Sequence, residues 1–590
     1  MKRWISLLLC LCMMAALCPS YAESDPSAED APAAEKTEHQ IVEKTVPSYL
    51  DGEKATDETY YCVDGEDGIL WVDLETWTPT FQSLLSRLGT DPGVQLTGEA
   101  NGDAYILKRE NNAIMGFDFE DSSIIFNDYD CFISKSYSAS IMDALSLADT
   151  DEDGKPYVFQ RQPDMSYDRP GGVKTFDLAS YGIQLIHQDG KYLVPLSTIV
   201  DITLSQKDGI SLIYNGQAVF LYVDGIFGTP DNLTPLGEIY SSAQPRDRTK
   251  AEAEYGYGEL CMVLDNFYGL KDIHKISSFD TLFANLQIQD ALKSPDSGLA
   301  DTALAAVIHL FLADAHSSVT MLSWMTPKDN EHKVLRKERT ITRISEFRSA
   351  FSTARQEYYP DGVPGYEEVG NTAFITFDSF SASLYTSKKI YDISEDQLKE
   401  SMTTDNLALV SYAHRQITRE NSPIENVVLD LSCNTGGAAD AAIFVISWFL
   451  GEAEIAFQDQ CTGALSAAVY KADINLDREF DEKDQLTGKN LYCLISPISF
   501  SCGNLVPAAF KSSQKVTLLG QQSGGGSCVV AHMVTTWGTM FQMSSSNDLS
   551  VFKNGSMYDI DQGIVPDYYL SKFSSFYDRA KLAEIINNMD

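Results

Sequence analysis

The sequence predicts an α/β domain in the carboxyl-terminal half of a 590-residue chain and a β-rich region in the amino-terminal half. Two observations predict the α/β part. Residues 426–451 read as a β-branched strand, a turn containing Gly436 and Gly437, and an apolar helix. Residues 491–520 repeat this strand–turn–helix order with serines in the turn. Since α/β folds usually carry their chemistry at carboxyl strand ends, we expect the functional site at these two turns.

The first 22 residues have the organisation of a secretory signal. Lys2 and Arg3 precede an apolar run over residues 4–18, and Ala22 ends the expected cleavage site. The run is short for a membrane span, and no later stretch approaches the roughly 18 continuous apolar residues that a span needs. We therefore expect a secreted, extracellular or cell-envelope protein without stable membrane insertion after signal removal.

The chain is strongly acidic, with a net charge of −40 at pH 7. Loss of Lys2 and Arg3 with the signal would take this charge to −42. Such acidity argues against nucleic acid and anionic membrane surfaces as partners. Eight cysteines follow residue 22 without the paired C-x-x-C spacing of structural zinc. Export permits disulfides, but buried free thiols fit the scattered spacing equally well.

Composition divides the rest of the chain into four segments. Residues 23–47 are rich in Glu, Asp, Ala and Pro, which predicts a disordered acidic linker. Residues 48–232 hold short apolar runs between Gly and Asn turns, which predicts a separate β-rich accessory domain. Residues 233–325 carry apolar residues at helical spacing and predict a helical segment. Residues 326–590 contain both strand–turn–helix units and predict the α/β core.

One acidic segment has the spacing of a calcium-binding loop. Oxygen donors stand at positions one, three, five, nine and twelve, namely Asp473, Asn475, Asp477, Asp481 and Asp484. Arg478 occupies the position that is usually glycine. A structural calcium ion is one interpretation of this segment, and a metal-free acidic loop is the other.

Ser501 is the candidate nucleophile. It lies between a buried strand and a helix, where backbone amides and the helix dipole favour negative charge. The amides of Gly436 and Gly437, with that of Cys502, are candidate donors to an oxyanion, because glycine lets the backbone approach a substrate closely. Taken alone, such a serine is more often a helix cap. A nucleophilic serine also needs a base and a group that orients the base.

Four motifs in order resemble the tail-specific, or carboxyl-terminal processing, serine peptidases and their tricorn-core relatives. They are VVLDLSCNTGG at 427–437, SFSCGNLVPAAFK at 499–511, LLGQQSGGG at 518–526 and QGIVPD at 562–567. The resemblance covers roughly residues 305–575. It implies a crotonase- or ClpP-like α/β core and a hydrolase that acts on proteins or peptides without a cofactor.

The base differs from that of the processing peptidases. Gly525 or Gly526 stands where those enzymes carry the lysine of a Ser–Lys dyad. The segment D-A-H-S at 314–317 is similar to the upstream histidine element of the tricorn-like branch, which implies His316 as the base. Neutral imidazole suits proton abstraction near pH 7. His532 is the reserve candidate for this role.

The same branch implies an acidic third member after the nucleophile. Asp561 is our choice, and Asp559 is the reserve candidate. The family often inserts a PDZ domain after the histidine, but 55 residues between Ser318 and Ala373 are too few for that fold. We therefore expect no PDZ domain.

The combined prediction is a secreted serine endopeptidase that uses Ser501, His316 and Asp561. Two alternatives remain open. One is a non-catalytic peptide- or glycan-binding protein on the same scaffold, since the lysine is missing. The other is an esterase or acyl transferase, although the G-x-S-x-G elbow of common esterases is absent around Ser501.

Overall fold

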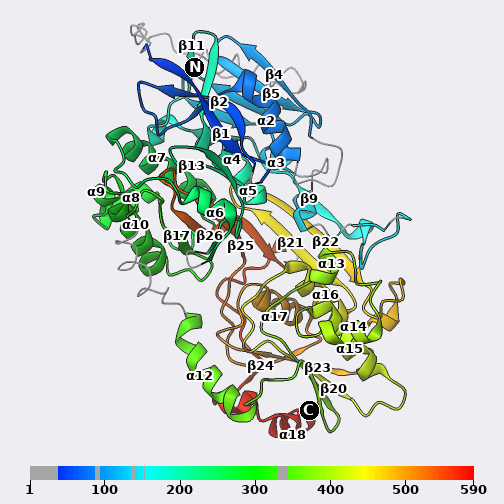
Figure 1. Ribbon diagram of the computed structural model, residues 1–590. Helices are drawn as coiled ribbons and strands as arrows, with labels where there is room; N and C mark the ends of the chain where they lie inside the picture. Colours follow the sequence, from blue (N-terminus) through cyan, green and yellow to red (C-terminus); the bar gives the residue numbers. More distant parts are fainter. Residues whose placement is uncertain are drawn as a thin grey trace, which may run out of the picture.

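The computed structural model describes residues 38–327 and 343–589, apart from gaps at 53, 87–93, 135–139, 146, 148, 152, 230–231 and 554. The predicted signal, residues 1–22, and most of the predicted linker lie outside the described residues. Figure 1 shows the amino-terminal strands at one end, the α/β region at the other, and helices with an antiparallel sheet between them. None of the described helices is long and apolar enough to cross a membrane.

Two sheets build the amino-terminal region. The first has the order β11-β12-β3-β2-β1-β14-β13, and the second β10-β7-β6-β5-β4. The strands of the first are Ile41–Tyr49 (β1), Thr56–Val63 (β2), Trp71–Asp73 (β3), Ile186–Gln188 (β11), Lys191–Pro195 (β12), Ser211–Tyr214 (β13) and Val219–Tyr222 (β14). Those of the second are Leu96–Asn101 (β4), Ala104–Arg109 (β5), Ile114–Asp118 (β6), Ser123–Phe126 (β7) and Lys174–Asp177 (β10).

The predicted linker is too long at its carboxyl end. Residues 41–47 lie in β1, which pairs with β2 on one side and β14 on the other. The composition of residues 23–47 as a whole predicted disorder, yet Val46 is buried in the sheet. Antiparallel pairing of residues 41–47 with β2, the next strand of the chain, decides its state.

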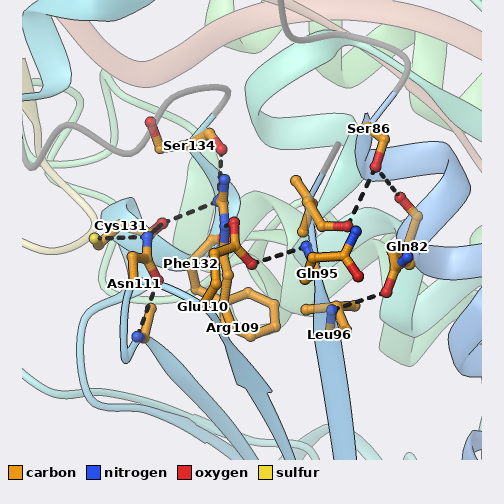
Figure 2. Close-up of polar contacts among 12 residues, drawn as sticks. Gln82, Ser86, Gln95, Leu96, Arg109, Glu110, Asn111, Cys131, Phe132 and Ser134 are labelled. Carbon is orange, nitrogen blue, oxygen red and sulfur yellow. Dashed lines mark hydrogen bonds and ion pairs between the residues drawn. The ribbon is translucent and has the colours of Figure 1, made fainter. Parts of the chain in front are cut away.

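A buried arginine joins the second sheet to a short helix. Arg109, at the end of β5, donates from Nη1 to the carbonyls of Phe132 and Ser134 at 2.8 and 2.6 Å. These carbonyls lie at the carboxyl end of helix α3 (Tyr129–Ile133), where they lack partners within the helix. Figure 2 shows this contact beside the Glu110–Gln95 and Gln82–Leu96 hydrogen bonds that hold β4.

Helices fill the next part of the chain. They are α6 (Pro235–Tyr240), α7 (Lys250–Phe267), α8 (Phe279–Asn285), α9 (Gln289–Leu292), α10 (Ser297–Ala306) and the π-helix Val307–Leu312. A capping box between Thr249 and Glu252 starts α7. The π-helix ends at Ala313 with φ 47°, and the chain then turns into the segment that carries His316.

An antiparallel sheet connects the amino-terminal region to the α/β region. Its order is β17-β26-β21-β22-β8, with β25 paired to β26 and β9 paired to β22. The strands are Phe159–Arg161 (β8), Tyr167–Arg169 (β9), Ser318–Met321 (β17), Ala453–Asp459 (β21), Ala464–Ala472 (β22), Cys528–Val534 (β25) and Met540–Ser550 (β26). Because β17 follows His316 directly and pairs with β26, this sheet fixes the histidine segment.

The amino-terminal region is not a separate domain, contrary to the prediction. One hydrophobic cluster contains Phe117 of β6, Phe267 of α7 and Phe541 of β26. Strands β8 and β9 also pair with β22 of the antiparallel sheet. The faces of the amino-terminal sheets are covered by elements from the rest of the chain, so the region shares its core with them.

The α/β prediction is confirmed for the carboxyl-terminal region. Strands β19 (Thr372–Thr376), β20 (Asn426–Asp430), β23 (Asn490–Ile495), β24 (Thr517–Gly520) and β29 (Tyr568–Tyr569) are parallel neighbours, and β18 (Tyr366–Val369) pairs antiparallel to β19. The flanking helices are α12 (Arg343–Tyr358), α14 (Glu395–Ser401), α15 (Asn406–Thr418), α16 (Ala439–Leu450), α17 (Cys502–Ser513) and α18 (Arg579–Asn587).

Both faces of this sheet are covered. Val427 and Leu429 of β20 belong to one cluster with residues of α15, α16 and α17, whereas Val428 belongs to another with residues of α12 and α18. Burial on both faces explains why β20 reads as an uninterrupted apolar run. The two turns after β20 and β23 meet at one sheet edge.

Candidate active site

Ser501 lies where β23 leads into α17, in a strained backbone conformation. Its φ is 57° and its ψ is −125°, values that residues with a side chain rarely adopt. The Ser501 amide donates to the Gly525 carbonyl at 2.9 Å, and its carbonyl accepts from the Asn504 and Leu505 amides. Helix α17 therefore begins at Cys502, and the half-buried Ser501 side chain sits at its amino-terminal end.

The two other serines of this turn have structural roles. Both are fully buried. Ser496 donates to the Ser432 carbonyl, and Ser499 donates to the Leu431 carbonyl at 2.7 Å while accepting from the Ser496 amide at 2.9 Å. These bonds fasten the second turn to the first.

The first turn approaches Ser501 closely. Gly436 has φ 100°, and a Cβ at that position would lie 2.6 Å from Ser501 Cβ and 3.1 Å from Ser501 Oγ. Asn434, completely buried, organises the turn: its Nδ2 donates to the Phe377 carbonyl at 3.1 Å, and its Oδ1 accepts from the Gly436 amide at 2.9 Å. Glycine at 436 is required by both the close approach and the backbone conformation.

The three predicted oxyanion donors differ in availability. The Gly436 amide already bonds Asn434, so the structure does not support its assignment. Burial raises the pKa of the Cys502 thiol to about 12, and a hydrogen bond from the Gly437 backbone opposes that shift. The Gly437 amide thus faces a neutral, weak acceptor. Within the described residues the Cys502 amide, first in α17, bonds no carbonyl. Gly437 and Cys502 therefore remain as candidate donors.

His316 lies beside the nucleophile turn. Its ring packs on Phe500, the neighbour of Ser501, with ring centroids 4.6 Å apart. Its Nδ1 faces Ser544 Oγ at 3.5 Å, and its carbonyl accepts from Gln542 at 2.8 Å. Burial lowers the pKa of His316, against the opposing charges of Asp314 and Asp561. In the part of the chain that the structure describes, no hydrogen bond joins the His316 ring to Ser501.

Asp561 is close enough to His316 for its charge to affect the imidazole. Its Oδ1 accepts from the Ser527 amide at 2.9 Å and from Ser527 Oγ at 3.1 Å. Burial raises the pKa of Asp561, and the Ser527 bonds oppose the shift. Asp559 is exposed, and its carboxylate accepts from the Asp561 amide at 3.0 Å. This contact is therefore with the Asp561 backbone and not with His316.

Asp314 is a second carboxylate at the histidine. Its Oδ1 accepts from the His316 amide at 3.0 Å, and its Oδ2 accepts from Ser317 Oγ at 2.5 Å. These bonds fix the backbone at the histidine rather than the ring.

A lysine base has no room at the glycine run. A Cβ on Gly525 would lie 1.9 Å from the Asp561 carbonyl oxygen, and one on Gly526 would lie 2.6 Å from the Phe500 ring. Both glycines also have φ near +90°. Sterics thus exclude a side chain at the two positions where the resemblance would place lysine.

The reserve base His532 and the calcium-binding candidates lie outside the neighbourhood of Ser501. His532 on β25 lies 3.6 Å from Asp224, outside the cavity wall described below. In the acidic loop, Asp473 and Asp484 accept backbone hydrogen bonds, and Lys483 pairs with Asp481. The described residues include no group of three or more His, Cys, Asp or Glu side chains that could hold a metal ion. Backbone amides of the loop itself donate to Asp473 and Asp484, and the calcium interpretation stays a prediction.

A cavity of about 390 Å³ opens beside Ser501. Gly437, Cys502 and Gly526 line it on the nucleophile side, and Phe457 and Leu549 supply apolar walls. Leu145, Ser205, Gln206 and Gly209 of the amino-terminal region complete the wall. The substrate-sized space is therefore built jointly by the two halves of the molecule.

A comparison with models of known protein families gives a match in the carboxyl-terminal α/β region. Residues 373–570 match the model of Peptidase family S41. This part of the chain is an S41 peptidase region. The match holds the Ser501 and Gly436 turns and Asp561, whereas His316 precedes it. The predicted kinship with the tail-specific serine peptidases, and the class of serine-type peptidase, are thereby confirmed at the level of the family.

Solved structures give partial likenesses to this chain. The photosystem II D1 C-terminal processing protease is 15% identical, with 35% of this chain and 45% of that chain covered and a TM-score of 0.25. Mature CPAF complexed with lactacystin is 12% identical over 58% and 99% of the chains, with a TM-score of 0.38. A lipoprotein from Streptococcus agalactiae is 15% identical over 57% and 97%, with a TM-score of 0.34. The chain thus spans less than half the length of the D1 protease. No curated protein matches the chain.

The structure brings Ser501, His316, Asp561, Gly437 and Cys502 into one neighbourhood. Sequence reasoning missed three contributors: the Phe500 ring beneath His316, Ser544 at its Nδ1, and the wall from the amino-terminal region. Phe500 is the sequence neighbour of the nucleophile, so its position next to Ser501 could have indicated a role in the site. Ser544 and Gln206 carry no motif, and no local pattern would have found them.

Proposed function

We propose that the chain is a secreted serine endopeptidase in which Ser501 attacks the peptide carbonyl and His316 takes its proton. The strongest support is the strained Ser501 at the start of α17, beside the Gly436 turn and a cavity large enough for a substrate side chain. The helix dipole and the Cys502 amide favour the developing oxyanion. Export rests on the predicted signal at residues 1–22.

In the proposed reaction, Ser501 Oγ forms a bond to the carbonyl carbon while its proton passes to the His316 imidazole. The carbonyl oxygen becomes an oxyanion held by the Gly437 and Cys502 amides. The carboxylate of Asp561 stabilises the imidazolium, which then protonates the leaving amine. Water, deprotonated by the same imidazole, hydrolyses the acyl-enzyme and restores Ser501. The residues of the site can perform each step without a cofactor.

A hydrogen bond between the His316 ring and Ser501, which the described residues do not show, must form for this reaction. Catalytic hydrogen bonds are often loose in a free enzyme and tighten when substrate binds. The Phe500 ring contact allows this, because it places the imidazole beside the residue next to the nucleophile.

Labelling with a fluorescent fluorophosphonate tests the proposal. The mature protein should become labelled, and Ser501→Ala and His316→Ala should each abolish labelling. Ser513→Ala is the matched control, since it removes a serine hydroxyl at the other end of the same helix. Labelling that persists in Ser501→Ala would refute the nucleophile assignment.

The missing Ser501–His316 bond also favours a second candidate, a peptide-binding protein on a peptidase scaffold. Such a protein would bind peptides equally well as wild type and as Ser501→Ala, and neither form would react with the fluorophosphonate. Binding without labelling would decide for this candidate.

A further inference from the structure

Two buried amide side chains line the cavity beside Ser501. Gln206 comes from helix α5 (Leu204–Asp208) of the amino-terminal region, and Asn547 comes from β26. Each side chain is 8% exposed. Gln206 Oε1 and Asn547 Oδ1 accept no hydrogen bond from any described residue. Buried amide oxygens are ordinarily bonded, so two orphans on one cavity wall require an explanation.

The orientation of the Gln206 amide is set by its own contacts. Its Nε2 donates to the Asp201 carbonyl at 2.8 Å and lies 3.7 Å from Met533 Sδ. Because Nε2 is already engaged, Oε1 is the polar atom of this amide that has no partner, and an amide oxygen can only accept a hydrogen bond. A ligand group that bonds Gln206 Oε1 must therefore be a hydrogen-bond donor.

The rest of the cavity is apolar or uncharged. Phe457, Leu505, Val530, Ala531 and Leu549 provide hydrocarbon surface. Burial raises the pKa of the Cys502 thiol to about 12 and that of the Cys528 thiol well above its usual value, so both thiols are neutral. No carboxylate belongs to the described lining. A cationic side chain would lose its hydration here without direct contact to a carboxylate, since Asp440 and Asp548 lie behind the lining thiols.

Resting on the proposed function, we infer that this cavity binds a substrate side chain next to the scissile bond that has an apolar body and a neutral terminal donor, with tyrosine as the best fit. The ring would contact the apolar walls, and its hydroxyl would donate to an amide oxygen of Gln206 or Asn547. A site built to bond a hydroxyl discriminates strongly against the analogue that lacks it. Where Gln206 is the acceptor, substrate choice depends on a residue of the amino-terminal region.

Matched peptides test the inference. We would determine kcat/KM for peptides that carry Tyr or Phe, Gln or Met, and Lys or norleucine at each flank of one cleaved bond. At one flank, kcat/KM for the Tyr peptide should exceed that for the Phe peptide by at least about tenfold. At the same flank, kcat/KM for the Gln peptide should exceed that for the Met peptide. Lys should show no advantage over norleucine. Equal rates for Tyr and Phe at both flanks, or a preference for Lys, would overturn the inference.

Variants assign the preference to the amides. Gln206→Met and Asn547→Leu keep the approximate size, and at least one of them should reduce the Tyr/Phe ratio toward one. Gln184→Met is the matched control, because Gln184 is an exposed glutamine of the same region that lies outside this cavity. The ratio is insensitive to a loss of folded protein, since both peptides meet the same enzyme. A ratio unchanged in both cavity variants would overturn the assignment.

Binding separates this inference from the proposed function. Fluorescence anisotropy with the Ser501→Ala protein measures affinity for the same peptides without cleavage. Tyr selectivity in binding, together with no Ser501-dependent cleavage, would refute the peptidase and retain the subsite. Cleavage without selectivity would retain the peptidase and refute the subsite.

Discussion

The turns after β20 and β23 occupy equivalent places in two successive strand–turn–helix units, yet they are built differently. In the first turn, positive φ values fall on Gly436 and Gly437, and a buried asparagine binds the Gly436 amide. In the second turn, the positive φ falls on Ser501, a residue with a side chain. The first turn is relaxed for its residue types, and the second is strained.

The three serine hydroxyls of the second turn differ in their surroundings, and the strained residue is the one that lines the cavity. Ser496 and Ser499 are buried and bonded to carbonyls of the first turn, whereas Ser501 is half-buried and lines the cavity. Strain of this kind persists where the surrounding structure overdetermines it, and it is commonest at functional sites. The comparison thus separates one reactive serine from two structural ones within six residues.

The largest expected effect on this comparison comes from the ion pair that anchors the first unit. Arg579 of α18 donates to Asp430 at the end of β20 at 2.6 Å, and both side chains are almost fully buried. Arg579→Ala would leave the buried Asp430 carboxylate without its positive partner and should lower the free energy of unfolding by about 3–5 kcal/mol. Urea unfolding measures this. The exposed Arg419–Glu368 pair is the control, and Arg419→Ala should cost about 0–1 kcal/mol. Similar losses for both variants would contradict the prediction.

The next effect would erase the difference between the turns. Gly436→Ala places a methyl group 2.6 Å from Ser501 Cβ and should displace the nucleophile, lowering kcat/KM by about 100-fold. Gly463→Ala controls for backbone strain alone, since Gly463 has φ 77° with open space around it. Equal activity of the two variants would show that the close approach has no catalytic role.

A smaller effect distinguishes Ser499 from Ser501. Ser499→Ala leaves the buried Ser496 amide without its acceptor, whereas the Leu431 carbonyl keeps its bond from the Asn434 amide, and the change should cost about 1–3 kcal/mol of stability. Ser501→Ala should change stability little while abolishing activity. Thermal unfolding with a parallel activity assay checks both. Loss of stability in Ser501→Ala but not in Ser499→Ala would invert the comparison.

The smallest effect is a shift in pH dependence. Because burial lowers the pKa of His316, the neutral base should persist below pH 6.5, and kcat/KM should fall on the acid side at an apparent pKa under that value. The charge of Asp561 raises the His316 pKa, so Asp561→Asn should move the acid limb to lower pH. A pH profile of kcat/KM for both proteins measures this. A limb centred above pH 7 would count against His316.

Local patterns predicted much of the fold and part of the site. The uninterrupted apolar runs of β20 and β23 identified buried parallel strands, and the glycine and serine turns identified the sheet edge. The resemblance then pointed to His316 and Asp561. The prediction of a separate amino-terminal domain was wrong because a sheet face that needs covering does not reveal, in its own sequence, which segment will cover it.

The sequence by itself determined the α/β class of the carboxyl-terminal region, the two turns, Ser501 and the absence of a lysine at the glycine run, because these depend on residues close together in the chain. Tertiary structure alone decided the rest. It packed His316 on Phe500, occupied the Gly436 amide, and set Gln206 in the cavity wall. Each of these follows from pairing and burial between segments far apart in sequence, such as β17 with β26, which no local periodicity encodes.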